Sequence, residues 1–471
     1  MRLLEEIRTE RLRRLLRVPG TAAAQEAYEG EGAGEGIIPF ARFLRVERVE
    51  IGGDRWLLHE GEGIILRQDA AAFRPPNPRR RLTRSREDPP YRAWLEVDLA
   101  ALSRNARRVA KHAAPARFVP MVKADAYGLG AVEVARALDG LEPYAFGVAT
   151  PPEGAELRRV GIERRIVVFA PSATAEISQL LEARLESAAL SLASFAKLEA
   201  GARAASTRIP AHLEVDTGMG RAGLPAAEAG AWTPEVASIL ARGGATLASV
   251  YTHFHSAGTD PAATSLQLTL LRRAAAILEE AGVEVPFLHA ANSDAVMGDP
   301  QYHLGLVRPG IYLYGGRRGA GAAGALADPE SVARVRAKVL EVRDLAPGST
   351  VSYGATYTTE SGERLATVGM GYADGLPWRL SNRGQALIRG TRVPIRGGVC
   401  MDVTSVDVSG APGVEAADVA TFLGRDGGEE IALADFAETA GTIEYEVLTA
   451  IGRRLPRHYV GGPADAADGS R

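Results

Sequence analysis

The sequence is poor in two residue types that carry reactive side chains, cysteine and lysine. Cys400 is the only cysteine among the 471 residues, which excludes an intramolecular disulfide, so the fold needs no oxidising compartment. Arginine supplies nearly all of the 55 basic residues, and the lysines are Lys111, Lys123, Lys197 and Lys338. Where arginine is the usual surface cation, a lysine in a particular place indicates a task that arginine cannot perform.

The sequence also lacks long apolar runs and a strong net charge. No run approaches the ~18 apolar residues that a membrane span requires, and charged residues occur throughout residues 1–8, unlike the apolar core of a signal peptide. We therefore expect a cytoplasmic protein with no membrane partner. The net charge of −3 argues against a nucleic acid as the main partner.

Residues 1–90 are expected to form an N-terminal extension followed by a linker. Residues 3–16 have the spacing of a short amphipathic helix, and the runs at 55–59 and 63–66 resemble strands. The stretch 74–90 combines proline pairs with arginines, which predicts an extended linker. So short a segment would form only a marginal core, so it is expected to pack on the rest of the protein, assist dimerisation or be partly disordered.

From residue 91 to residue 325, short β-rich runs alternate with longer amphipathic stretches such as 172–183 and 263–280. Eight such units predict an α/β fold, a (β/α)8 barrel of TIM type. A doubly wound sheet is the alternative that the same periodicity allows. The expected barrel strands are 118–124, 145–149, 165–170, 185–190, 211–216, 246–254, 285–291 and 304–309.

The pattern changes again at about residue 326. The runs 332–342, 365–368, 386–393 and 403–408 are short and β-rich, with glycine-rich turns between them. Helix is expected only near 433–439 and 445–452. Residues 326–471 are therefore predicted to form a mostly antiparallel β domain.

Polar residues gather where the barrel strands are expected to end, the edge that faces the active site in a TIM-type barrel. Lys123 ends the first expected strand, and polar clusters at 216–221, 251–254, 291–293 and 308–311 end or follow the fifth to eighth. The loops after strands seven and eight commonly bind phosphate in such barrels. A lysine that can lose its proton and act as a nucleophile, facing a phosphate site, meets the requirement of pyridoxal 5′-phosphate.

Five motifs along the chain resemble the alanine racemase family. They are VKADAYGLG at 122–130, DTGMGR at 216–221, VRPG at 307–310, VSYG at 351–354 and GYADG at 371–375. The resemblance implies a pyridoxal-phosphate-dependent isomerase that interconverts L-alanine and D-alanine as a homodimer with shared active sites. In a bacterial host this activity would supply D-alanine for the peptidoglycan of the cell wall.

The resemblance also implies which residues carry the chemistry. Lys123 would hold the cofactor and serve one face of the substrate Cα, and Tyr353, lent by a second subunit, would serve the other as the second base. His253 would lie against the cofactor ring, and Arg308 would face the pyridine nitrogen. The residues implied around the cofactor phosphate are Tyr127, Ser293, Gly310, Ile311 and Tyr445.

The same resemblance implies the substrate-binding residues, and it shows two positions at which this sequence departs from the family pattern. Arg221 and the backbone amide of Met401 would hold the substrate carboxylate, and Tyr372 would narrow the entrance. Glu214 stands where the family often has a lysine that becomes carbamylated, and we hypothesise that its carboxylate replaces the carbamate and pairs with Arg221. Gly398 stands where an arginine is common, which affects the outer substrate corridor.

Other interpretations stay open at this point. The rivals are a racemase of broader or different specificity, such as one for serine, a non-catalytic pyridoxal-phosphate-binding protein and a barrel decarboxylase. The C-terminal domain with Tyr353 argues against the binding protein, and Arg308 argues against the decarboxylase, which would be expected to place a carboxylate opposite the pyridine nitrogen. His253 and His255 have no cluster of thiols or carboxylates near them in sequence, so no metal is expected; His289 and His303 are expected to be hydrogen-bonded loop or core histidines.

Overall fold

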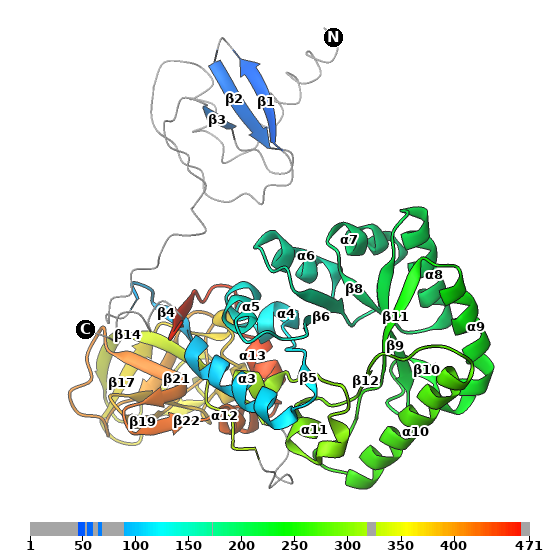
Figure 1. Ribbon diagram of the computed structural model, residues 1–471. Helices are drawn as coiled ribbons and strands as arrows, with labels where there is room; N and C mark the ends of the chain where they lie inside the picture. The colour runs from blue at the N-terminus through cyan, green and yellow to red at the C-terminus, as the bar shows by residue number, and fades with distance from the viewer. Residues whose placement is uncertain are drawn as a thin grey trace, which may run out of the picture. The chain divides into compact units, whose positions relative to one another are not determined.

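The computed structural model describes residues 46–51, 54–59, 65–67, 89–171, 173–317 and 326–462, and the chain divides into two units, Met1–Asp88 and Pro89–Arg471. The described part of the first unit is an antiparallel sheet of β1 (Val46–Ile51), β2 (Asp54–His59) and β3 (Ile65–Arg67) (Figure 1). Strands β2 and β3 coincide with the two expected runs. The helix expected at 3–16 and most of the linker expected at 74–90 lie outside the described residues.

The second unit contains a nearly closed barrel of eight parallel strands, as the sequence predicted. The strand order is β5-β13-β12-β11-β9-β8-β7-β6. A bridge between Met121 and Gly147 joins the two end strands, and the amide of Val122 donates to the carbonyl of Gly147 at 2.8 Å. The strands are β5 (Arg117–Phe118), β6 (Ala145–Val148), β7 (Arg165–Val168), β8 (Glu186–Ala189), β9 (Ile209–Asp216), β11 (Ala245–Tyr251), β12 (Leu288–His289) and β13 (Leu306–Val307), with β10 (Leu224–Pro225) paired to β9.

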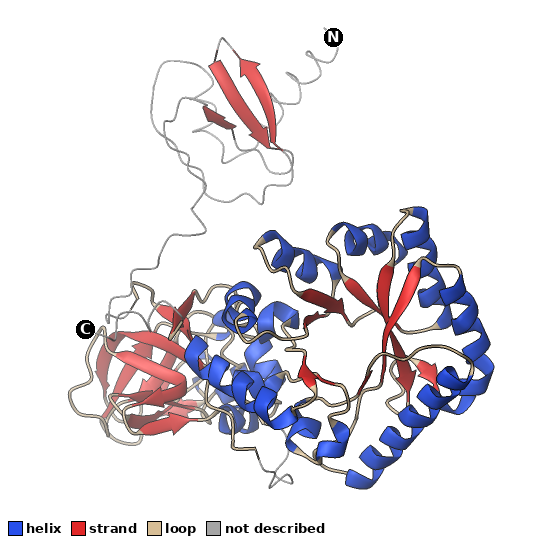
Figure 2. Ribbon diagram, in the orientation of Figure 1, coloured by secondary structure: helices blue, strands red, loops and turns tan. Residues whose placement is uncertain are grey.

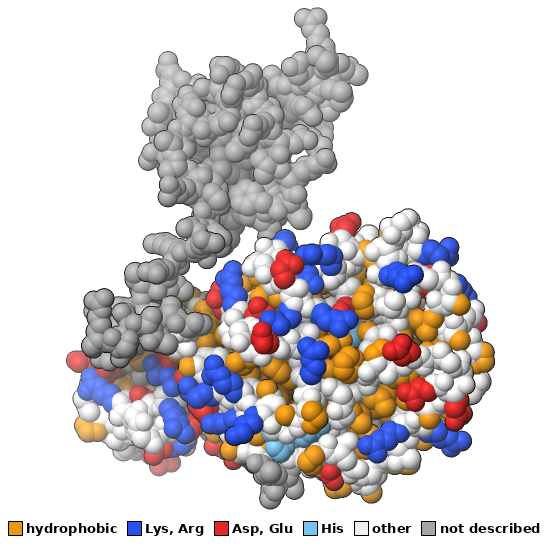
Figure 3. Space-filling view, viewed as in Figure 1, with side chains coloured by type: hydrophobic (Ala, Val, Ile, Leu, Met, Phe, Trp, Pro, Cys, Tyr) orange, Lys and Arg blue, Asp and Glu red, His pale blue; other side chains and the backbone are white. Residues whose placement is uncertain are grey.

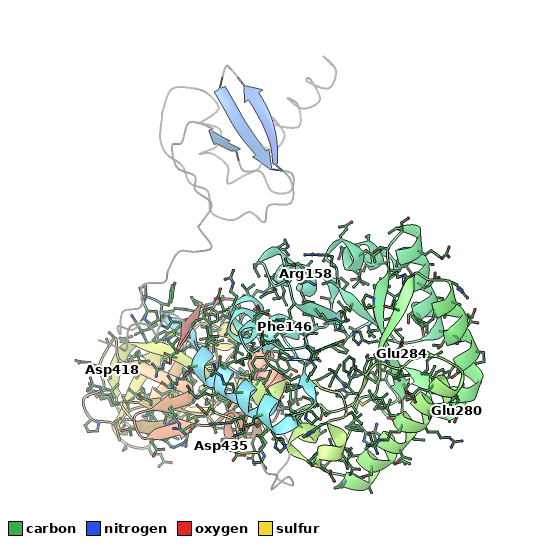
Figure 4. All side chains as sticks on the ribbon, in the orientation of Figure 1. Phe146, Arg158, Glu280, Glu284, Asp418 and Asp435 are labelled. Atoms are coloured by element: carbon green, nitrogen blue, oxygen red, sulfur yellow. The ribbon has the colours of Figure 1, made fainter. Side chains whose placement is uncertain are left out.

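Helices cover the outside of the barrel (Figure 2). Their apolar faces explain their position: in α3 the buried residues recur at helical spacing, and Asp98 caps the helix by accepting from the amide of Ala101 at 2.9 Å. The long helix α10 begins at Pro261 behind the cap Asp260 and ends at Glu280, at the outer edge of the barrel (Figure 4). The helices are α3 (Leu99–Ala113), α5 (Ala131–Asp139), α6 (Pro151–Arg159), α7 (Ile177–Glu182), α8 (Leu192–Ala204), α9 (Ala229–Ala241), α10 (Pro261–Glu280) and α11 (Ser293–Met297).

Three barrel strands, β5, β12 and β13, are reduced to two residues each, and each shortening lies beside the site. The expected strand 118–124 is interrupted at Pro120, and the one at 304–309 stops before Pro309, because proline cannot donate to a strand ladder. The strand expected at 285–291 is reduced to β12. The backbone beyond these strands is irregular, and it carries the lysine, the serine and the arginine that the motifs singled out.

The C-terminal part is a mostly antiparallel sheet with the order β19-β18-β21-β14-β17-β20. Its central strand β14 also pairs with β4, which precedes the barrel in sequence, and β4 pairs in parallel with the last strand, β23. The strands are β4 (Ala93–Asp98), β14 (Ala333–Leu345), β17 (Glu363–Val368), β18 (Gln385–Ile388), β19 (Thr391–Pro394), β20 (Thr404–Asp407), β21 (Val419–Asp426), β22 (Glu429–Ile431) and β23 (Arg457–Val460), with the separate pair β15 (Thr350–Val351) and β16 (Tyr357–Thr358). Two helices, α12 (Leu433–Ala440) and α13 (Glu444–Thr449), follow β22.

The visible face of the second unit mixes basic, acidic and apolar side chains (Figure 3). Within the described part of the chain, no helix combines the length and the apolar character needed to cross a membrane. Within the same residues, no three His, Cys, Asp or Glu side chains are grouped so that they could hold a metal ion.

Candidate active site

Lys123 opens a strained turn, α4 (Lys123–Tyr127), rather than ending a strand. The next four residues, Ala124 to Tyr127, all have φ between 53° and 57°, the left-handed region that non-glycine residues avoid. The turn is held from outside: Glu153 accepts from the amide of Ala124 at 2.9 Å, and Asp125 accepts from the amide of Ala131 at 2.7 Å. Backbone strain of this kind persists only where its surroundings fix it, and it concentrates at functional sites.

The C-terminal helix α13 packs against this turn and completes a cavity. At Gly128 a Cβ atom would lie 2.5 Å from the carbonyl oxygen of Leu448, so this close approach of two backbones requires glycine. The cavity has a volume of about 420 Å³, and its walls include Lys123, Tyr127 and Tyr445. A volume of this size is within the range of roughly 300–1,000 Å³ that is usual for small-molecule sites.

Lys123 reaches solvent at this cavity, yet it lies among other positive charges. Burial lowers the pKa of its ammonium group, the charges of Arg221 and Arg308 lower it further, and Glu153 opposes them. A lowered pKa increases the fraction of neutral amine, which is the form that acts as a nucleophile or base. This is the property that an arginine at position 123 would lack.

A second group of residues meets where β12 and β13 end. The hydroxyl of Ser293 accepts from the amides of Gly310, at 2.9 Å, and Tyr312, at 3.3 Å. A Cβ at Gly310 would lie 2.3 Å from the hydroxyl of Tyr127, so glycine lets that tyrosine approach the backbone. The ring of Tyr127 also lies 6.0 Å from the ring of Tyr445. The structure therefore brings together four of the five residues implied at the phosphate, and Ile311, the fifth, follows Gly310 in the short helix η4 (Ile311–Tyr314).

Arg308 is buried in the barrel mouth and is fixed from several sides. Its guanidinium donates to the carbonyl oxygens of Thr252 at 2.9 Å and Ala290 at 3.2 Å, to Nδ1 of His253 at 3.3 Å, and to Nδ1 of His289. Burial lowers the pKa of Arg308 to about 10, so it stays positively charged at neutral pH. Burial, followed by the charges of Arg308, Arg221 and Lys123, lowers the pKa of His253 to about 3, so this histidine is neutral.

Glu214 and Arg221 lie close enough to attract each other. Their nearest atoms, Arg221 Nη2 and Glu214 Oε1, are 3.8 Å apart, which is an ion pair without a hydrogen bond. The other oxygen of Glu214 accepts from the hydroxyl of Tyr251 at 2.8 Å, and the ring of Tyr251 lies 5.2 Å from the guanidinium carbon of Arg308. Burial raises the pKa of Glu214, while Tyr251 and Arg221 act in the opposite direction.

Tyr353, Met401 and Tyr372 gather elsewhere, on linked loops of the C-terminal domain. The hydroxyl of Ser352 donates to the carbonyl of Gly398 at 2.6 Å, and the amide of Tyr372 donates to the carbonyl of Cys400 at 3.0 Å. All three side chains are exposed, Tyr353 by 81%. None of them belongs to the walls of the cavity beside Lys123 in the same chain.

Sequence reasoning assigned no role to three residues that the structure draws into the site: Glu153, Tyr251 and His289. Tyr251 and His289 are stacked at 4.9 Å, directly behind Arg308. A polar residue at the end of a buried parallel strand is unusual, and that signal was present in the sequence at both positions. Glu153 gave no comparable signal in the sequence. A glutamate in the first turn of a helix is explained by its capping role, and Glu153 occupies that position in α6.

Comparison with known proteins assigns the family. Residues 97–318 match the N-terminal domain of alanine racemase, and residues 332–459 match its C-terminal domain. An alanine racemase of Carboxydothermus hydrogenoformans is 39% identical over 375 residues, which cover 78% of this chain and 99% of the relative. The structure of alanine racemase from D-cycloserine-producing Streptomyces lavendulae is similar at a TM-score of 0.75 and 34% identity, and covers 80% of this chain and 99% of its own. That of Bartonella henselae, with covalently bound pyridoxal phosphate, is similar at a TM-score of 0.71 and 28% identity, over 79% of this chain and 100% of its own. The chain belongs to the alanine racemase family.

Proposed function

We propose that Lys123 and Tyr353 carry out the racemisation of alanine that membership of this family assigns to the protein, with pyridoxal 5′-phosphate as the cofactor. The observation that carries the proposal is the position of Lys123 on a strained turn, beside a cavity lined by Tyr127 and Tyr445 and near the positive charges of Arg221 and Arg308. Arg308 in place of a carboxylate favours a racemase over a barrel decarboxylase.

The residues present fit the cofactor. Lys123 is an amine with a lowered pKa, which covalent attachment to an aldehyde requires. The hydroxyl of Ser293 accepts from the amides of Gly310 and Tyr312, so its own proton can donate to a phosphate oxygen, and Tyr127 and Tyr445 line the cavity. When bound there, pyridoxal phosphate supplies an electron-withdrawing ring that stabilises negative charge at the substrate Cα. Ser293, Gly310, Ile311, Tyr127 and Tyr445 would hold its phosphate, His253 would lie on its ring and Arg308 would face its nitrogen.

Racemisation requires a proton to leave one face of Cα and another to arrive on the opposite face, so two groups are needed. We assign Nζ of Lys123 to one face and Oη of Tyr353 to the other. Arg221 and the amide of Met401 bind the substrate carboxylate and so fix Cα between the two bases. Tyr372 limits the space beside Cα, which favours a methyl side chain over a larger one.

We infer that Glu214 supplies the negative charge that a carbamylated lysine supplies in many family members. The ion pair at 3.8 Å and the hydrogen bond from Tyr251 support this role, because together they hold a carboxylate beside Arg221. Gly223 adds support: a Cβ there would lie 3.1 Å from Cγ of Glu214, so glycine leaves room for that side chain.

The function requires a second copy of the chain. Tyr353, Met401 and Tyr372 are exposed side by side in one chain, and Tyr353 is among the most exposed of its large apolar side chains. We infer that the protein is a homodimer in which this loop group lies over the Lys123 cavity of the partner. Full activity of a proven monomer would contradict the dimer. The cytoplasmic location expected from the sequence stays a prediction.

The test of the proposed function is chemical trapping of the cofactor. The purified protein is reduced with borohydride and digested, and peptide mass mapping locates the modified lysine. We expect pyridoxyl modification at Lys123, no visible cofactor absorption in Lys123→Ala or Lys123→Arg, and normal absorption in the control Lys197→Arg, whose lysine is exposed on α8. Modification at another lysine would refute the assignment.

Substrate assays complete that test. Loss of α-deuterium is followed from L-alanine, D-alanine and serine. We expect release from both alanine enantiomers, little from serine, and a loss in Tyr353→Phe that is larger for L-alanine than for D-alanine. Normal racemisation by Tyr353→Phe in both directions would contradict the two-base assignment.

A further inference from the structure

A chain of hydrogen bonds crosses the barrel interior, with one residue from each of five adjacent strand positions. It starts at Arg308, after β13, which donates to Nδ1 of His289 on β12. Nε2 of His289 lies 2.8 Å from the hydroxyl of Ser249 on β11, which lies 2.6 Å from Nδ1 of His212 on β9. Nε2 of His212 lies 2.9 Å from Oε2 of Glu186 on β8.

The far end of this chain of hydrogen bonds reaches solvent. Glu186 Oε1 accepts from Nε of Arg165, the first residue of β7, at 2.5 Å, and the Arg165 side chain is 44% exposed. Glu186 also begins its strand, whereas His289 ends its own. The chain therefore descends from the mouth of the barrel to its opposite end as it passes from strand to strand, following the stagger of the strands.

When both histidines are neutral, only one arrangement of protons satisfies every bond. A guanidinium can only donate, so Nδ1 of His289 must accept and its proton must be on Nε2. A carboxylate can only accept, so Nε2 of His212 must carry its proton. The hydroxyl of Ser249 then accepts from His289 and donates to Nδ1 of His212. Both ends of the chain thus impose the same direction, with every proton pointing from Arg308 towards Glu186.

We propose that Glu186, His212 and Ser249 are positioning residues that act through His289 on Arg308, by fixing the tautomer in which His289 presents a lone pair to the guanidinium. This inference rests on the proposed function. It gives the polar side chains inside the barrel a role, which is to position Arg308, the residue that would face the cofactor ring. None of the three touches the Lys123 cavity.

The negative charge of Glu186 fixes the direction at its own end of the hydrogen-bond chain, as Arg308 does at the other. The hydrogen bonds from His212 and Arg165 outweigh the effect of burial and hold the pKa of Glu186 below its usual value, so it remains an acceptor. A glutamine in its place offers both a donor and an acceptor, so the chain could reverse. Reversal would place a proton on Nδ1 of His289, against a donor of Arg308, and that contact would be lost.

The structure offers a matched control for each of two test variants, Glu186→Gln and Ser249→Ala. Glu199 on α8 is as buried as Glu186 and also forms an ion pair with a partly exposed arginine, Arg203, at 2.8 Å, but it lies outside the chain. Ser187 on β8 is fully buried like Ser249, and its hydroxyl donates to the backbone carbonyl of Ala188 at 3.3 Å. Glu199→Gln and Ser187→Ala therefore repeat the chemical changes of Glu186→Gln and Ser249→Ala without touching Arg308.

The experiment is nitrogen NMR of the holoenzyme labelled with ¹⁵N in its 8 histidines, with resonances assigned by single His→Gln variants. Protonated and unprotonated ring nitrogens are read separately. We expect Nε2–H forms of His289 and His212 in the parent, and a measurable fraction of His289 in the Nδ1–H form in Glu186→Gln, where only Arg308 still fixes the direction. We also expect a shifted visible absorption and a turnover lowered about 10-fold or more in Glu186→Gln and Ser249→Ala, with Glu199→Gln and Ser187→Ala unchanged within about 2-fold.

Several results would overturn the proposal. They are an Nδ1–H form of His289 in the parent, an unchanged tautomer and absorption in Glu186→Gln, or equal losses in Ser249→Ala and Ser187→Ala. If Glu186→Gln does not fold, Ser249→Ala and Ser249→Thr decide, since threonine keeps the hydroxyl and should restore turnover at least in part. Absence of racemisation or of cofactor absorption in the parent would refute the proposed function instead, and the histidine resonances would still report the direction of the chain.

Discussion

The contact between Gly310 and Tyr127 allows a steric test of the cofactor site. In Gly310→Ala the new Cβ would lie 2.3 Å from the Tyr127 hydroxyl oxygen and 3.0 Å from Cζ. The first distance is more than ~1 Å shorter than favourable contact between heavy atoms. Tyr127 cannot easily retreat, because it is buried and its ring lies 4.7 Å from that of Tyr314. The φ of Gly310 is −125°, outside the left-handed region, so the cost of alanine is mainly this contact.

Overpacking of this kind costs about 1–3 kcal/mol. The phenol must also leave its place near the phosphate group, so we expect cofactor affinity to fall by about 10-fold or more. Removing the hydroxyl in the double variant Gly310→Ala with Tyr127→Phe should recover part of the stability, since the shortest contact disappears while the 3.0 Å contact remains. The two changes should therefore be strongly non-additive.

The assay is urea unfolding of the four proteins of this cycle, with cofactor titration followed by absorbance. Gly230→Ala is the control, because a Cβ at Gly230 meets nothing within 4 Å. Alanine in the helix α9 should slightly stabilise the protein, by about 0.5–1 kcal/mol. Additive losses in the cycle, or a Gly310→Ala variant with parental stability and affinity, would refute the packing argument.

Three further predictions concern charged groups. Glu214→Gln should raise the KM for alanine by about 5-fold or more with little change in unfolding, because it removes a charge beside Arg221; an unchanged KM would contradict its role. Burial raises the pKa of Glu444 from 4.5 to about 7, so the folded state binds an extra proton and stability should fall as pH rises from about 4.5 to 7 and then level off. Glu444→Gln should flatten that part of a plot of Tm against pH, and an unaltered slope would refute the assignment. Asp374→Asn should cost about 1–3 kcal/mol and raise KM, because buried Asp374 anchors the loop of Tyr372 through Arg92 and Arg454 at 3.3 and 3.2 Å; calorimetry that finds no loss would contradict this.

Much of the fold could be predicted because it depends on local patterns. Buried parallel strands give short apolar runs, amphipathic helices give their own period, and all eight expected barrel strands are found near their expected places. The pairing of β4 with the C-terminal sheet was not predicted. Trp94 and its neighbours form an ordinary strand sequence just before the barrel, and nothing local says that the partner is β14, more than two hundred residues later.

The site was predictable residue by residue but not as a three-dimensional arrangement. A left-handed course for Ala124–Tyr127 contradicts the preference of alanine and tyrosine, and aspartate adopts it only as a single residue, so it follows from tertiary contacts such as that of Glu153. His289 is a buried hydrogen-bonded histidine, as expected, but its link to Ser249 and His212 depends on the register of three strands. Sequence motifs identify the reacting residues. The residues that contact them inside the barrel can be identified only once the pairing of the strands is known.

The central claim is that each active site joins Lys123 of one subunit to Tyr353 of the other. It is tested most directly by mixing two inactive variants, Lys123→Ala and Tyr353→Phe, under conditions that allow subunits to exchange. In a mixed dimer one site has both native residues and the other has neither, so an equal mixture should recover about one quarter of the parental activity. Activity that stays at the level of the separate variants after proven exchange would contradict the shared site.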